Sequence, residues 1–270
     1  MTFVKPKKYL GQHFLKDENI AQKIVESLSL KNAYASVLEV GAGMGMLTKY
    51  LLKSPSLIDL QGKGEQLKVF VSEVDQESVE YLLHKFPELK GKIFGDVLQI
   101  DFNALPFGEG RVGLIGNFPY NISSQILFKV LEYRNQIPEV VGMFQKEVAE
   151  RIASKPKNKS YGILSVLMQS FYNVEYLFEV SEQVFVPPPK VKSAVLRFTR
   201  NNITNLPCDE KLFFQVVKTA FNQRRKMLRN GLKNLIGESS SPIPFLTQRA
   251  EELTCEQFQE LTLCIQNMNK

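Results

Sequence analysis

Short apolar runs alternate with amphipathic stretches over the first 200 residues of this 270-residue chain. The apolar runs have the length of single buried strands, and the apolar residues between them recur at helical spacing. This alternation predicts an α/β fold in which helices cover both faces of a parallel sheet. We expect strands at residues 36–40, 68–73, 92–95, 111–116, 139–144, 174–180 and 194–199. We expect helices at residues 46–53, 77–86, 123–133, 146–153 and 161–171.

The pattern changes after residue 200. A polar linker, Asn201–Pro207, is followed by stretches with helical periodicity at residues 210–221, 225–236 and 256–267. We therefore predict two domains, an α/β domain over residues 1–200 and a smaller all-helical domain over residues 201–270.

Composition argues against several kinds of function. The chain has two histidines and three cysteines, and no cysteine pair has the Cys-x-x-Cys spacing. A metal cluster, a disulfide scaffold and a Ser-His-Asp site are therefore not expected. No apolar run approaches the roughly 20 residues that span a bilayer, and the basic N-terminus lacks the apolar core of a secretory signal. We expect a cytoplasmic protein with no metal and no membrane partner.

Basic residues are clustered in this chain, whose formal net charge is +6. One acid-free group runs from Lys218 to Lys233, and another from Lys190 to Arg200. Two further groups lie near the N-terminus and at residues 151–159. Any single group is most simply an ordinary solvated face. Four groups together favour contacts with the phosphate backbone of a nucleic acid.

A glycine-rich loop follows the strand expected at residues 36–40. Gly41, Gly43 and Gly45 let the backbone approach a ligand closely, and the helix that follows favours a negative group at its N-terminus. The dinucleotide fingerprint G-x-G-x-x-G needs a glycine where Met46 stands, and the sequence has no G-x-x-x-x-G-K-[ST] loop. The loop therefore favours a nucleotide-like ligand other than a dinucleotide or a nucleoside triphosphate.

Polar residues follow three of the expected strands. Glu73, Asp96 and Asn117 each come after an apolar run, where a doubly wound sheet has its binding crevice. Glu73, rather than nearby Asp75, sits at the strand end and suits a bidentate hydrogen bond to ribose hydroxyls. Asp96 can accept from an adenine amino group. One such residue alone is most simply a turn or helix-cap residue, but three in one crevice predict a nucleoside site.

The segment Asn117-Phe118-Pro119-Tyr120 resembles the N-[LIF]-P-Y motif of the ribosomal RNA adenine dimethyltransferases. The resemblance covers essentially the whole chain. Further segments that resemble this family are Tyr9–Leu15, Leu38–Gly45, Phe185–Ser193 and Ala220–Asn230. The last of them is similar to the C-terminal helix of the small-subunit (KsgA or RsmA) branch.

The resemblance implies a Rossmann-like sheet of the class I S-adenosylmethionine-dependent methyltransferases, joined to a helical domain that binds ribosomal RNA. It implies dimethylation at N6 of two adjacent adenosines in the 3′-terminal hairpin loop of 16S rRNA, in the small ribosomal subunit. It further implies a monomer that does not act on DNA. The residues expected to contact S-adenosyl-L-methionine are His13, Leu15, Gly41, Gly43, Glu73, Asp96 and Asn117. The expected catalytic residues are Asn117, Phe118, Pro119, Tyr120 and Phe185. The residues expected to bind RNA are Lys190, Arg224, Arg225, Lys226 and Arg229.

The chemistry of an adenine amine fits this motif. The amine is a poor nucleophile because its lone pair is delocalised into the ring. The Asn117 side-chain oxygen and the Phe118 carbonyl can accept its two hydrogens and aim the lone pair at the methyl group. Tyr120 would stack on the extruded base, while Phe185 is expected to cover its other face. A sulfonium is already an activated leaving group, so no metal or strong base is required.

Two alternatives stay open at this point. One is a large-subunit rRNA adenine methyltransferase of the macrolide-resistance type, against which the basic stretch 221–230 argues. The other is a non-catalytic ribosome assembly factor, against which the intact Asn117–Tyr120 motif argues. The chain departs from the family at Ser54–Leu67, which we expect to be a lengthened surface loop.

Overall fold

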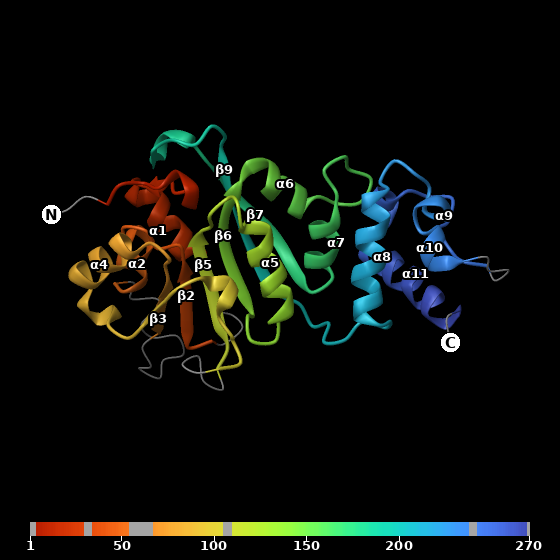
Figure 1. The fold of residues 1–270 in the computed structure, drawn as a ribbon, viewed down its shortest axis with the longest axis horizontal. Coiled ribbons are helices and arrows are strands. Elements are labelled where there is room, and N and C mark those ends of the chain that lie inside the picture. The colour runs from red at the N-terminus through yellow and green to blue at the C-terminus, as the bar shows by residue number, and fades with distance from the viewer. Residues whose placement is uncertain (1–3, 30–33, 54–66, 105–109, 238–241, 269–270) are drawn as a thin grey trace. The chain divides into compact units, whose positions relative to one another are not determined.

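The computed structural model describes residues 4–29, 34–53, 67–104, 110–237 and 242–268 (Figure 1). The strands are β1 (Phe14–Leu15), β2 (Ser36–Val40), β3 (Lys68–Ser72), β4 (Ile93–Phe94), β5 (Val112–Asn117), β6 (Glu139–Gln145), β7 (Tyr172–Val180), β8 (Phe185–Val186) and β9 (Ser193–Arg200). The α-helices are α1 (Glu18–Glu26), α2 (Met46–Leu51), α4 (Gln76–Lys85), α5 (Ser123–Glu132), α6 (Lys146–Ala153), α7 (Ile163–Gln169), α8 (Glu210–Asn222), α9 (Leu228–Gly231), α10 (Lys233–Ile236) and α11 (Cys255–Met268).

The described residues contain one seven-stranded sheet, in the order β4-β3-β2-β5-β6-β9-β7. The pairs β2–β3, β2–β5, β3–β4 and β5–β6 are parallel, as predicted. Strand β9 is antiparallel to β6, which the expectation of a parallel sheet did not include. The chain passes from β2 to β3 on one side and later adds β5 on the other. In such a sheet a ligand binds beyond the carboxyl ends of the strands at the point where their order reverses, here β2 and β5.

A buried cluster holds the first two helices against this sheet. Ile24 of α1 and Leu51 of α2 pack in one hydrophobic cluster with Ile115 of β5 and Val141 of β6. Every residue of β2 is buried, including the polar Ser36 and Glu39, as expected for a central strand covered on both faces. Helix α1 is not among the elements expected from the sequence. It begins where the Asp17 side chain accepts a hydrogen bond of 3.0 Å from the backbone amide of Ile20.

The chain forms two compact units, residues 1–149 with 175–200 and residues 150–174 with 201–270. The change after Arg200 coincides with the expected boundary. Residues 150–174 differ from that expectation, because they group with the C-terminal helices rather than with the α/β unit. Aromatic side chains explain this grouping: Tyr161 lies 6.0 Å from Phe221 of α8, and Phe221 lies 5.8 Å from Phe258 of α11, measured between ring centroids.

Most of the expected elements agree with the structure within two or three residues, but the single helix expected at residues 225–236 is wrong. Only α9 and α10 form there. The backbone before α9 bonds elsewhere, since Met227 bridges to Arg249 and the Leu228 amide donates to the Gln248 carbonyl at 2.8 Å. The expected loop Ser54–Leu67 lies outside the described residues except for Leu67. No helix in the described ranges has the length and apolarity needed to span a bilayer.

Gly116 of β5 gives a test of this packing. A Cβ added there would lie 2.4 Å from the carbonyl oxygen of Val40 in β2. Because strand β2 is held by both its neighbours, we expect Gly116→Ala to lower the free energy of unfolding by about 1–3 kcal/mol. Gly95→Ala is the matched control, since its Cβ would meet nothing within 4 Å. Chemical denaturation measures both variants, and equal stabilities would contradict the prediction.

Candidate active site

A cavity opens at the carboxyl ends of β2, β3 and β5, with about 910 Å³ of empty space including the solvent at its mouth. Its place at the carboxyl ends of the strands, where their order reverses, suits a small-molecule or cofactor site. Segment 10–15 and the glycine loop 41–44 contribute to its walls. All the residues expected to contact the cofactor line it: His13, Leu15, Gly41, Gly43, Glu73, Asp96 and Asn117. Phe118, Pro119 and Tyr120 line it as well.

The glycine loop is shaped by left-handed backbone conformations. Gly43 has a φ of +53°, and a Cβ added to it would lie 2.8 Å from the Phe14 ring. Glycine is therefore needed at this position for conformation and for space. The amide of Gly43 donates to the Glu73 carboxylate at 2.8 Å. The loop is thus tied directly to the acid that follows β3.

The Glu73 carboxylate is almost fully engaged by backbone amides. Its Oε1 accepts from the amides of Val74 (2.8 Å) and Asp75 (2.9 Å), and its Oε2 accepts from Gly43. Each carboxylate oxygen has two acceptor positions, so one remains, on Oε2. The predicted bidentate bond to two ribose hydroxyls does not fit this arrangement, which leaves room for one. Burial raises the pKa of Glu73, and the amide bonds oppose that shift.

Asp96 uses one of its two oxygens as a local cap. Its Oδ1 accepts from the amide of Leu98 at 2.9 Å, at the start of the short 3-10 turn Val97–Gln99. The side chain still reaches the cavity wall. The turn fixes the direction of the carboxylate, and its second oxygen can accept from an amino group in the cavity.

The orientation of the Asn117 amide is set by a hydrogen bond from outside its own strand. Asn117 ends β5, and its Nδ2 donates to the backbone carbonyl of His13 at 2.9 Å. A carbonyl only accepts, so the amide nitrogen must face His13 and Oδ1 must face the other way. The side-chain oxygen is therefore the group that Asn117 offers to a ligand amine.

Tyr120 is held on two sides. Its ring stacks on His13 with centroids 5.7 Å apart and planes at 27°, and its hydroxyl forms a 2.6 Å hydrogen bond with the buried Ser193. Burial raises the pKa of Tyr120. His13 is itself fixed by a 2.8 Å contact between Nδ1 and the Pro187 carbonyl. The phenol ring is thus restrained at the cavity wall, as a base-stacking residue requires.

The structure does not bring Phe185 into the cavity. Its side chain is 1% exposed and packs in the buried cluster of the sheet, opposite Leu15 in the two-stranded sheet of β1 and β8. Its expected place over the base remains a prediction that this arrangement does not favour. The Phe118 ring is also buried and packs edge-on against Phe144 at 5.3 Å, which leaves its backbone carbonyl as its functional group.

Sequence reasoning did not single out Glu39, although it lies in the Leu38–Gly45 segment. Glu39 lines the cavity, is 2% exposed and accepts a 2.5 Å hydrogen bond from Thr48. Burial raises its pKa to about 8, with the nearby Glu73 charge adding to the shift. A carboxyl within a glycine-loop motif is the signal that could have drawn attention to it. Among the described residues, no group of three or more His, Cys, Asp or Glu could hold a metal ion.

A mostly parallel sheet whose strand order reverses at a glycine loop, with an acid after β3 and an amide at the end of β5, is the arrangement of the class I S-adenosylmethionine-dependent methyltransferases. The residues present fit that cofactor, because the loop glycines admit it closely and Glu73 keeps one acceptor position for a ribose hydroxyl. A dimethyladenosine transferase from Plasmodium falciparum has a similar fold, with a TM-score of 0.73 at 23% identity over 92% of this chain and 96% of that one.

Sequence comparison identifies the family. Residues 4–266 match the family described as ribosomal RNA adenine dimethylase. The chain is 55% identical over 264 residues to the ribosomal RNA small subunit methyltransferase A of Cytophaga hutchinsonii, with 97% of this chain and 98% of that protein covered. It is 56% identical over 265 residues to the protein of the same name from Flavobacterium johnsoniae, with 97% and 96% covered. The chain belongs to the ribosomal RNA adenine dimethylase family.

The raised pKa of Glu39 predicts a pH dependence of stability. Its carboxyl binds a proton up to about pH 8 in the folded state but only up to about pH 4.5 when unfolded. The folded state therefore holds more protons in this range, and stability falls as pH rises. Between pH 5 and 8 we expect the free energy of unfolding of the cofactor-free protein to fall by about 3–4 kcal/mol from this group.

Glu39→Gln is the matched variant, because its amide oxygen can still accept from Thr48 and it does not titrate. Denaturation of both proteins across this pH range measures the difference between their slopes. Parallel pH profiles for the two would show that Glu39 titrates normally.

Proposed function

We propose that this protein transfers methyl groups from S-adenosyl-L-methionine to the N6 amines of two adjacent adenosines in the 3′-terminal hairpin loop of 16S rRNA, dimethylating each. The observation that carries the proposal is the Asn117 amide, whose nitrogen is taken by the His13 carbonyl and whose oxygen is left for an amine. Relatives at 55–56% identity are named ribosomal RNA small subunit methyltransferase A, which favours this reading over a large-subunit enzyme or a non-catalytic assembly factor.

The chain's own residues position the amine. Asn117 Oδ1 and the Phe118 carbonyl accept its two hydrogens, which draws the nitrogen lone pair out of the ring. Tyr120 stacks on the base, a contact worth about 1–3 kcal/mol, and Ser193 fixes the ring that does so. With the cofactor bound, the lone pair would form the new N–C bond as the sulfur–methyl bond breaks and S-adenosylhomocysteine leaves, and the amine would then lose a proton to water. Bound S-adenosylmethionine supplies an activated methyl group, so positioning and electrostatics carry the catalysis.

The cofactor is held by the glycine loop and the strand ends in this proposal. Glu73 takes one ribose hydroxyl on its remaining acceptor position, and the free oxygen of Asp96 takes the adenine amino group of the cofactor. His13 and Leu15 close the cavity from the side of β1. Glu39, two residues before the loop, lines the same cavity and is a further contact available to the cofactor.

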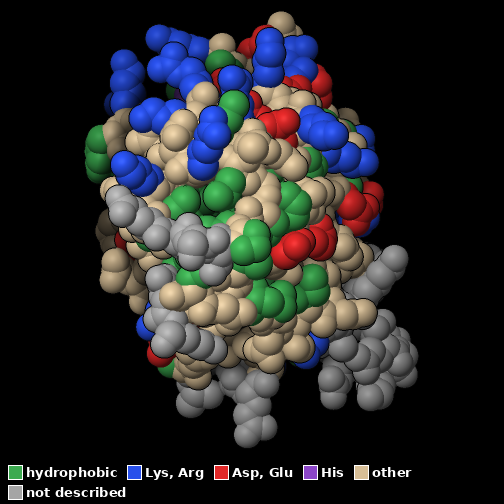
Figure 2. All heavy atoms as spheres, turned by 90° about the vertical axis from the view of Figure 1, so that its right-hand side faces the viewer, with side chains coloured by type: hydrophobic (Ala, Val, Ile, Leu, Met, Phe, Trp, Pro, Cys, Tyr) green, Lys and Arg blue, Asp and Glu red, His purple; other side chains and the backbone are tan. Residues whose placement is uncertain are grey.

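The basic residues of the C-terminal unit form the proposed RNA contact. Figure 2 shows Lys and Arg side chains gathered toward the top of the face that carries the C-terminal helices. Arg225, Lys226 and Arg229 are exposed, and within the described parts of the chain none of them has an ion-pair partner. Arg224 differs, because it pairs with Glu251 at 3.1 Å. We assign phosphate contacts to the three unpaired residues and to exposed Lys190, and a supporting role to Arg224.

The same proposal covers the setting of the reaction. The substrate is the 16S rRNA within an assembling small ribosomal subunit, and DNA is not a substrate. The enzyme acts as a monomer in the cytoplasm. Incubating the purified protein and labelled cofactor with isolated small or large subunits, and mapping dimethyladenosine in the rRNA, tests the proposal directly. Label only in the large subunit, or in neither, would overturn it.

Asn117→Ala tests the proposed catalytic group. We expect methyl transfer to fall by about 100-fold or more, because an aligned acceptor in a closed site is lost. Unfolding temperature should change little, and methyl transfer should fall by a larger factor than affinity for S-adenosylhomocysteine, because the side chain also bonds the His13 carbonyl beside the cavity. Gln125→Ala, an exposed amide on α5, is the matched control and should leave transfer unchanged. Normal turnover by Asn117→Ala would refute the assigned role.

The RNA contact is tested by salt dependence. Replacing Arg225, Lys226 and Arg229 by alanine should weaken binding to small-subunit RNA and lower the slope of log affinity against log salt by about 0.7–0.9 for each lost phosphate contact. Lys211→Ala, which removes one exposed charge elsewhere in the same unit, is the control. An unchanged slope in the triple variant would show that these residues face away from the RNA.

A further inference from the structure

The segment from Lys7 to Leu15, here called the N-terminal strap, runs along one side of the cavity, with residues 10–15 in its wall. Its end near β1 is held by pairing with β8 and by the His13–Pro187 contact. At the same end, the His13 carbonyl orients the Asn117 amide. The strap therefore contacts both the cofactor side and the catalytic side of the site. Its other end is held by contacts outside the cavity wall.

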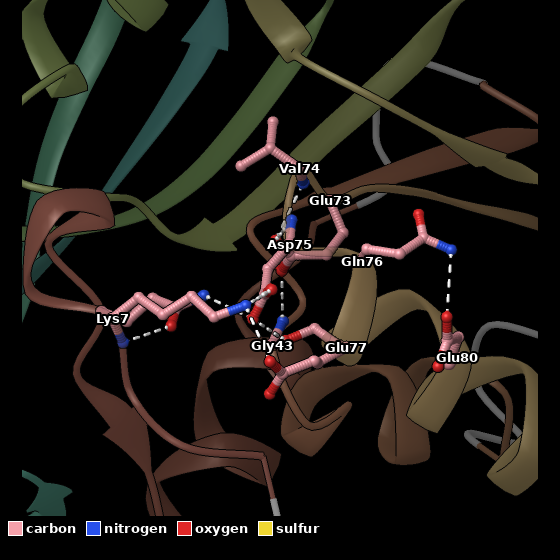
Figure 3. A network of polar contacts seen from close by, with 10 residues as sticks. Lys7, Gly43, Glu73, Val74, Asp75, Gln76, Glu77 and Glu80 are labelled. Carbon is pink, nitrogen blue, oxygen red and sulfur yellow. Dashed lines mark hydrogen bonds and ion pairs between the residues drawn. The ribbon is translucent and has the colours of Figure 1, made fainter.

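That end is held by Asp75, the residue two positions after Glu73. Asp75 accepts a hydrogen bond from Lys7 Nζ, with which it also forms an ion pair, and one of 3.3 Å from Gln12 Nε2 (Figure 3). The strap closes on itself there, because the Lys7 amide donates to Gln12 Oε1 at 2.8 Å. Lys7 also pairs with Glu77 at 3.3 Å, but that side chain is 59% exposed.

The position of Asp75 makes this use of its side chain unusual. Asp75 is the N-cap residue of α4, where an aspartate normally accepts from backbone amides of the first turn, yet its side chain makes no such bond. Its carboxylate, 1% exposed, serves Lys7, Gln12 and the Ser78 hydroxyl instead. Burial alone would raise the pKa of Asp75, but these hydrogen bonds hold it below its ordinary value. The carboxylate is thus ionised and committed to the strap.

Asp75 also connects the strap to the proposed ribose contact. Its backbone amide donates to Glu73 Oε1 while its side chain holds Lys7 and Gln12. Asp75 itself does not line the cavity, whereas Glu73 and Gln12 do. The turn Glu73–Asp75 therefore fixes both the Glu73 carboxylate in the cavity wall and the N-terminal strap beside it.

We propose that Lys7, Gln12 and Asp75 form a clamp that holds the N-terminal strap closed against the cofactor cavity and so sets how long the cofactor stays bound. The three are positioning residues, since they act through the strap on His13, Leu15 and Asn117. This inference rests on the proposed function for the identity of the cofactor. It assigns to Lys7 a role that its place outside the cavity wall would not suggest.

The test measures release of S-adenosylhomocysteine, the demethylated cofactor, in the absence of RNA. Lys7→Met keeps the aliphatic stem and removes the charge, and we expect about tenfold faster dissociation with a smaller change in association. Lys8→Ala, the exposed neighbour, is the matched control and should dissociate like the wild type. Glu77→Gln should also have little effect, because exposed ion pairs contribute little. Equal dissociation from Lys7→Met and Lys8→Ala would overturn the clamp.

A double-mutant cycle separates a clamp from a general loss of stability. In an Asp75→Asn background, Lys7→Met should add no further acceleration, because its partner charge is already gone. Hydrogen exchange in the cofactor-free protein gives a second readout: Lys7→Met should speed exchange in residues 10–12 and leave β2 unchanged. If Asp75→Asn does not fold, the exchange result with Lys7→Met still decides. Additive effects, or acceleration throughout the sheet, would contradict the clamp.

The outcomes distinguish this inference from the proposed function. If the wild type binds S-adenosylhomocysteine but methylates no rRNA, the substrate assignment fails and the clamp can still hold. If the wild type methylates rRNA and the Lys7→Met variant releases the ligand at the wild-type rate, the clamp fails alone.

Discussion

The hydrogen bond from the Asn117 amide to the His13 carbonyl is the interaction on which the site depends. An asparagine at a strand end can present either its oxygen or its nitrogen, and only the oxygen can receive an amine hydrogen. The choice is made by a backbone group 104 positions away along the chain. The catalytic motif is therefore incomplete by itself, and the strap that carries His13 supplies the missing constraint.

Most of the sheet and of the site could be predicted from the sequence because both depend on short stretches of neighbouring residues. Buried parallel strands give continuous apolar runs, and their polar ends must meet at one edge, so Glu73, Asp96 and Asn117 could be brought together without coordinates. Other contacts are not local. The Gly43 amide that binds Glu73 and the Leu15 strand that pairs with Phe185 come from segments distant in sequence, whereas the other two amides on Glu73 belong to the next two residues.

The C-terminal part shows the same limit. Helical periodicity at residues 225–236 is real, but the backbone there pairs with residues near Arg249, and tertiary hydrogen bonds override the local preference. Likewise, the apolar pattern of residues 150–174 does not show which unit they belong to. They belong to the helical unit because their side chains pack there, as the Tyr161 ring does against Phe221 of α8.

The ion pair between Arg224 and Glu251 lowers the entropy that the neighbouring basic residues lose when they bind RNA. Arg224 also donates to the Asn158 carbonyl at 3.4 Å, so the irregular stretch after α8 is held near its start. Long basic side chains on a loose loop lose much conformational entropy when they bind phosphates. Here folding already orders the backbone that carries Arg225 and Lys226. Because Arg224 pairs with Glu251 rather than with RNA, these two neighbours are preorganised for binding phosphates.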